Sequence, residues 1–88
     1  MVKIVKLTQD VFKITVSGIV TTQHEVTVTD IAYRHLTSGR ITKEELLKLS
    51  FKFLLDREPN TSILSKFDIT VISQYFPEYK SELFQILS

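Results

Sequence analysis

The sequence predicts an α+β fold, in which an N-terminal three-stranded antiparallel β-meander packs against four or five short C-terminal helices. Residues 2–28 alternate between apolar and polar side chains with the period of half-buried strands. Residues 29–87 carry apolar side chains at helical spacing and are interrupted at Pro59 and Pro77. Because a chain of 88 residues buries one hydrophobic core, residues 1–88 are expected to form a single domain.

The β-meander is expected to begin with a hairpin formed by residues 2–8 and 11–17. The apolar face of its second strand consists of Phe12, Ile14 and Val16. A third strand, rich in β-branched residues, follows a turn at Gly18 and runs to Val28. His24 lies by parity on the apolar face of this strand. A sheet of three short strands is stable only with a covering layer on its apolar face.

The strongest local signal in the chain is a helix start at residues 41–46. The Thr42 side chain can accept a hydrogen bond from the backbone N–H of Glu45, while the Glu45 carboxylate reaches back to the N–H of Thr42. Ile41 and Leu46 are spaced to form the hydrophobic staple that fixes how the chain enters the helix. A capped helix therefore begins at Thr42.

The remaining helices lie on both sides of this start. A first helix through residues 32–36 ends at Gly39, which suits the left-handed conformation of a helix terminator. The helix from Thr42 stops before Pro59 and is apolar around most of its circumference, so it should lie between the sheet and the later helices. The later helical segments are a short turn over residues 63–67, with Asn60, Thr61 or Ser62 as its cap, residues 69–76 with Asp68 as a cap, and residues 78–87 after Pro77.

Composition excludes several classes of function. There are 11 basic and 10 acidic residues, and a net charge of +1 gives no electrostatic footprint for DNA binding. The chain has no cysteine, which excludes disulfides and thiolate catalysis. No apolar run is long enough to cross a membrane, and lysines interrupt the N-terminal apolar segment where a secretory signal would lie. We therefore expect a cytoplasmic protein that does not bind membranes.

Acid–base or metal chemistry would have to begin with the two histidines, His24 and His35. A histidine on the apolar face of a strand, such as His24, usually forms a hydrogen bond with a backbone group. His35 lies near the end of a helix, where a positive charge interacts favourably with the helix dipole. No metal-binding spacing, glycine-rich phosphate loop or nucleophile elbow is present, so no metal or cofactor is expected and a non-enzymatic protein is favoured.

The candidate binding residues are Arg57, Tyr75, Phe76 and Tyr79. Arg57 lies in a polar run at a helix exit and could bind an anion or carboxylate; alternatively it pairs with a neighbouring acid while Asn60 caps the next turn. Three aromatic residues around Pro77 would form a protein-recognition patch at an exposed helix junction. The alternative is that they pack in the core.

Several segments together carry a resemblance to a known family: residues 24–28, 53–60, 62–64, 67–68, 71–73 and 75–79. Their pattern resembles a family of short, uncharacterised single-domain bacterial proteins with the same order of strands followed by helices. The resemblance implies a bacterial origin and a cytoplasmic location. It implies no activity, ligand or site residue.

Three functional hypotheses follow. The leading one is a small non-enzymatic protein-binding or adaptor module, which binds itself as a homodimer or binds another protein, through a sheet edge or the junction at residues 75–79. The second is weak RNA or ribosome association through Lys3, Lys6, Lys13, Arg34 and Arg40. The third is a small enzyme with a pocket near His24 or Arg57.

Overall fold

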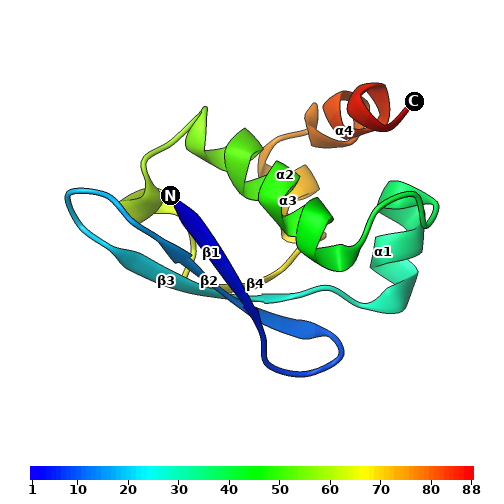
Figure 1. Cartoon of the computed structure of the whole chain (residues 1–88). Helices are drawn as coiled ribbons and strands as arrows, with labels where there is room; N and C mark the ends of the chain where they lie inside the picture. The colour runs from blue at the N-terminus through cyan, green and yellow to red at the C-terminus, as the bar shows by residue number, and fades with distance from the viewer.

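A four-stranded sheet in the order β1-β2-β3-β4 carries helices on one of its faces (Figure 1). The computed structural model describes residues 1–88 in full. The strands are β1 (Val2–Lys6), β2 (Val11–Val16), β3 (Thr22–Thr27) and β4 (Lys66–Asp68). The helices are α1 (Asp30–Thr37), α2 (Lys43–Leu55), α3 (Val71–Tyr75) and α4 (Tyr79–Leu87), with a 3-10 turn η1 (Asn60–Ser62). None of these helices has the length and apolar character needed to span a membrane.

The N-terminal β-meander is confirmed. β1 and β2 are antiparallel, as are β2 and β3. Phe12 pairs with Val26 and Ile14 pairs with His24, and all four side chains are buried on the face that the helices cover. The third strand is shorter than expected, because the chain loops outward before it and leaves Ile19 fully exposed.

The fourth strand was not expected from the sequence. The predicted helical turn over residues 63–67 does not form: residues 60–62, which were expected to cap it, form η1 themselves, and the chain then extends into β4, which pairs in parallel with β3. The His24 ring donates from Nδ1 to the carbonyl oxygen of Leu64 at 2.7 Å, and so fixes the segment ahead of β4 against β3. The sheet is therefore mixed and four-stranded, not a three-stranded antiparallel meander.

The predicted helix over residues 69–76 is shorter in the structure. The Asp68 carboxylate accepts hydrogen bonds from the backbone N–H and the hydroxyl of Thr70, at 3.0 and 2.8 Å. This local turn occupies the position where the cap was expected, and α3 begins only at Val71. The short helix ends at Tyr75, just ahead of Pro77.

The start of α2 has the predicted capping box. The backbone N–H of Glu45 donates to the Thr42 hydroxyl at 3.1 Å, and the N–H of Thr42 donates to the Glu45 carboxylate at 3.0 Å. The hydrogen bond from the backbone N–H of Thr42 is the largest cause that holds the pKa of the Glu45 carboxyl below its ordinary value. At the end of α1, Ser38 and Gly39 both adopt positive φ, 54° and 74°, so the left-handed turn begins one residue before the expected glycine.

Replacing Thr42 with alanine is expected to lower the free energy of unfolding by about 1 kcal/mol, because an N–H in the first turn of α2 loses its acceptor. Urea denaturation followed by circular dichroism measures the change. The matched control is Thr61→Ala, which removes an exposed threonine from η1 and should leave the unfolding midpoint unchanged. Equal midpoints for both variants and the wild type would contradict the role of the cap.

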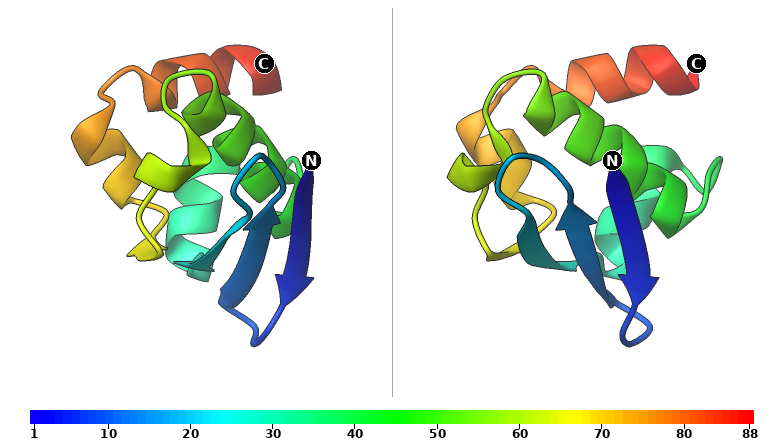
Figure 2. Two further views of the ribbon diagram at one scale, coloured as in Figure 1. Left: turned by 90° about the vertical axis from the view of Figure 1, so that its left-hand side faces the viewer. Right: turned by 60° about the vertical axis from the view of Figure 1, so that its left-hand side comes forward.

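Helix α2 lies between the sheet and α4 in every view, as its broad apolar surface predicts (Figures 1 and 2). Toward the sheet, the Phe51 ring packs against His24 and Phe67 with ring centroids 5.5 and 6.3 Å apart. Toward α4, the Phe53 ring meets Tyr79 edge-on at 5.2 Å. One helix therefore joins the two layers, and its aromatic side chains form the centre of the core.

Candidate functional site

The three aromatic candidates at the junction of α3 and α4 lie in three different environments. Tyr75 is 67% exposed, Phe76 is half-buried, and Tyr79 is only 1% exposed. The Ser50 hydroxyl donates its one proton to the Leu46 carbonyl, so the Tyr79 hydroxyl donates to Ser50, at 2.7 Å. Tyr79 is therefore a core residue, in line with the core-packing alternative.

The Arg57 guanidinium is occupied by groups of its own chain. Its Nε donates to Glu78 at 3.1 Å, one terminal nitrogen pairs with Glu82, and the other donates to the Phe53 carbonyl at 3.1 Å. The guanidinium also lies over the Phe53 ring, 3.6 Å from its centroid. The pKa of the Glu78 carboxyl is lowered by a hydrogen bond from its own backbone N–H and by Arg57. Arg57 thus fastens α4 to the end of α2.

Replacing Arg57 with alanine is expected to lower the free energy of unfolding by about 1 kcal/mol, since partly exposed ion pairs and one cation–π contact are lost together. Thermal unfolding measures the change. Arg57→Lys should be about as destabilised as Arg57→Ala, because an ammonium group cannot reproduce the planar set of donors with which the guanidinium binds Glu78, Glu82 and the Phe53 carbonyl. Lys52→Ala is the control, since Lys52 is an exposed cation in the last turn of α2 and forms no ion pair. A loss as large in Lys52→Ala would contradict the assignment.

Asn60 and His24 form part of one polar chain at the end of the sheet. The Asn60 side chain does not cap a following turn; its amide donates to the Val20 carbonyl at 2.7 Å and to the Thr22 hydroxyl at 3.0 Å. Thr22 in turn bonds Nε2 of His24 at 2.8 Å, and Nδ1 of His24 bonds Leu64. Both imidazole nitrogens therefore have protein partners, and the ring is buried.

The five basic residues considered for RNA binding are not brought together. Lys3 and Lys13 lie on the uncovered face of the sheet, while Lys6 has the opposite parity. Arg34 is exposed on α1, and Arg40 donates to a carbonyl at the end of α4 at 2.7 Å. The five cations therefore do not share a single face of the sheet. No group of three or more histidine, aspartate and glutamate side chains is arranged to hold a metal ion.

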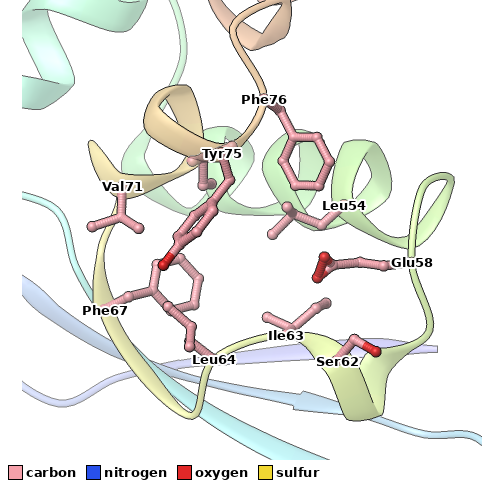
Figure 3. Close-up of a pocket in the computed structure, with 10 residues that line it drawn as sticks. Leu54, Glu58, Ser62, Ile63, Leu64, Phe67, Val71, Tyr75 and Phe76 are labelled. Carbon is pink, nitrogen blue, oxygen red and sulfur yellow. The ribbon is translucent and has the colours of Figure 1, made fainter.

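A cavity of about 380 Å³ opens between the end of α2, the segment from η1 to β4, and α3 (Figure 3). Eight of its ten lining residues are hydrophobic. The lining consists of Leu54, Glu58, Ser62, Ile63, Leu64, Phe67, Val71, Ile72, Tyr75 and Phe76. Two further cavities, of about 230 and 190 Å³, lie beside α4. The larger cavity contains two of the predicted binding residues, Tyr75 and Phe76.

The mouth of this cavity exposes large apolar side chains to water. Tyr75 is 67% exposed and Leu64 is 46% exposed. The Tyr75 ring extends from α3 toward Leu64 and Phe67, across one side of the opening (Figure 3). On the other side, the Glu58 side chain points inward from the end of α2. Glu58 is the one charged residue of the lining.

Sequence reasoning did not find Glu58 or Leu64 as site residues. The sequence predicts a helical turn at Ile63 and Leu64, in which both side chains could face the core. In an extended segment, neighbouring side chains point to opposite sides, and here Ile63 is buried while Leu64 is exposed. A pair of apolar residues between Ser62 and Ser65 was the signal, but it becomes informative only once the segment is known to be extended.

Comparisons with known proteins add no relative to this description: no protein-family model, no curated protein and no solved structure matches the chain. The cavity beside Tyr75 is the strongest candidate for a binding site, because it combines concave shape, apolar lining and exposed aromatic surface.

Proposed function

We propose that this protein is a small non-enzymatic protein-binding module, which holds an apolar side chain of a partner protein in the cavity beside Tyr75. The observation that carries the proposal is the mostly hydrophobic lining of a 380 Å³ cavity whose rim is open to water. This volume is near the lower limit of ligand sites, roughly 300–1,000 Å³. It suits the side chains of a short peptide segment better than an extended cofactor.

The exposed rim supplies the free energy of such an interaction. Tyr75 and Leu64 would lose apolar contact with water when a partner covers them. Tyrosine is enriched among the residues that dominate protein interfaces, because its large ring loses little conformational entropy on binding. Both residues stand on regular or tightly anchored segments: Tyr75 ends α3, and the carbonyl of Leu64 accepts from His24. The rim is thus held in shape before a partner arrives.

The polar groups of the cavity favour binding over catalysis. They are the Glu58 carboxylate and the hydroxyls of Ser62 and Tyr75. Neither histidine contributes to the lining, and the His24 ring is engaged elsewhere. The Glu58 carboxylate forms no hydrogen bond with either hydroxyl, so neither hydroxyl is paired with a base in the way that an activated nucleophile would be.

The free edge of the sheet is a weaker candidate for an interface. β1 pairs only with β2 and leaves its outer edge open. Lys3 and Lys6 lie on this strand, and lysines on an edge strand oppose pairing with another chain. A homodimer through β1 would place these cations in the new sheet, whereas the cavity beside Tyr75 needs no such arrangement.

Selection from a random peptide library displayed on phage tests the proposal. The wild-type protein is the bait, and the recovered peptides are then measured against the double variant Leu64→Ala/Tyr75→Ala. Both side chains are exposed, so the double variant should remain folded. The matched control is Ile31→Ala/Phe84→Ala, which removes two exposed apolar side chains from α1 and α4.

The expected result is a set of peptides with a common apolar residue, whose affinity falls at least about tenfold in the cavity variant, as loss of an interface hot spot implies. The control variant should bind them as the wild type does. Recovery of no binding peptide, or equal binding to the cavity variant, would overturn the proposed function.

A further inference from the structure

One acidic side chain in the cavity has no partner. Glu58 is half-buried at the end of α2, and its carboxylate points into the cavity between Leu54 and Ile63 (Figure 3). None of the ion pairs or side-chain hydrogen bonds of the protein includes it. A carboxylate among apolar side chains loses part of its hydration, and a cation is the group that compensates for this loss.

The other half-buried acids of the chain do have donors. Asp10 and Glu25 form ion pairs, and Asp68 accepts two hydrogen bonds. Their partners are Lys43, Lys66 and Thr70, respectively. The remaining acids without a partner, Glu44 and Asp56, are exposed to solvent. Glu58 therefore differs from every other carboxylate in combining partial burial with the lack of a partner.

We infer that the segment bound in this cavity carries a lysine or arginine next to its apolar anchor, and that Glu58 pairs with that cation. This inference rests on the proposed function and names the chemistry of the partner. A long cationic side chain can lay its methylene stem along Leu54 and Ile63 while its charged end reaches Glu58. The same carboxylate repels fatty acids and acidic peptides, which leaves a basic and apolar peptide as the occupant.

A set of synthetic peptides on one neutral scaffold tests the inference. Each has a central leucine or phenylalanine anchor, flanked by lysine, glutamine or glutamate. Fluorescence anisotropy measures the dissociation constants with wild type, Glu58→Gln and Leu64→Ala/Tyr75→Ala, at low and high ionic strength. Glu58→Gln keeps the size of the side chain and removes only its charge, and Asp56→Gln is the control for loss of a nearby exposed acid.

With the wild type, lysine peptides should bind about tenfold more tightly than glutamine peptides, as expected for a hydrogen bond between charged groups. This preference should disappear in Glu58→Gln, weaken at high ionic strength and persist in Asp56→Gln. A lysine preference that survives in Glu58→Gln would overturn the inference. If glutamine peptides bind the wild type as tightly as lysine peptides do, and both lose affinity in Leu64→Ala/Tyr75→Ala, the inference is overturned while the proposed function is supported. Absence of binding by every peptide would overturn both.

Discussion

Replacing Phe51 with alanine is expected to lower the free energy of unfolding by about 3–5 kcal/mol. The Phe51 ring is fully buried and packs between His24 of the sheet and Phe67, so its removal leaves a cavity at the junction of the two layers. A domain of 88 residues has a total stability of roughly 4–13 kcal/mol. The variant should therefore lose a large part of its stability, and urea denaturation with circular dichroism measures the loss.

The matched control for this variant is Phe84→Ala, which removes the same side chain from α4, where it is 50% exposed. Its effect should be much smaller, because about half of the Phe84 surface is already in contact with water in the folded protein. Similar losses in the two variants would contradict the placement of α2 at the centre of the fold.

The stability of the protein is expected to fall steeply in strongly alkaline solution because of Tyr79. Burial raises the pKa of the Tyr79 hydroxyl from 10.0 to about 12, against the smaller opposing effect of its hydrogen bond with Ser50. Between these pH values the unfolded chain releases this proton and the folded protein keeps it. The free energy of unfolding therefore decreases as pH rises from 10 to 12, by about 1.4 kcal/mol per unit and about 2–3 kcal/mol in total.

Denaturation of wild type and Tyr79→Phe at a series of pH values isolates this contribution. Tyr79→Phe should be less stable than wild type by about 1 kcal/mol at neutral pH, because a buried hydrogen bond is lost. Above pH 10, the free energy of unfolding of Tyr79→Phe should decline less steeply than that of the wild type, because the variant has no hydroxyl to ionise at this position. Tyr75→Phe, which alters an exposed tyrosine, is the control. Parallel pH profiles for wild type and Tyr79→Phe would contradict the buried position of Tyr79.

Local chemistry made much of this fold predictable. The capping box at Thr42 and Glu45 depends on residues three positions apart, so the sequence contains all of its determinants. Alternation along β2 places Phe12 and Ile14 on the same face, whichever strands β2 pairs with. The connections between the first three strands are short, and short connections favour antiparallel pairing of consecutive strands. The broad apolar surface of α2 similarly required contacts on two sides.

Features that depend on distant contacts could not be predicted in this way. β4 has three residues, too few for a periodic pattern, and it becomes a strand because β3 provides its pairing partner and His24 holds Leu64. The acids that pair with Arg57 lie on α4 rather than beside it in the sequence. For Tyr79, its spacing from Leu83 indicates a shared helix face, but only the packing of α4 on α2 shows that this face is buried.

The candidate site was predictable only where its signal is local in the sequence. Tyr75 and Phe76 stood out because aromatic residues gather around Pro77, a signal within a few residues. Glu58 could not be recognised, because one glutamate at a helix end is ordinary in any sequence. Its significance comes from the segment of η1 and β4 that folds across the end of α2 and encloses its carboxylate with apolar side chains.

The most direct test of the cavity as a binding site is a titration of the isotopically labelled protein with the tightest peptide from the selection, followed by two-dimensional NMR. Binding beside Tyr75 predicts that the largest chemical-shift changes occur within residues 58–76, a range that contains nine of the ten residues lining the cavity. Largest changes in β1 or α4, with residues 58–76 unaffected, would contradict the assignment of this cavity as the binding site.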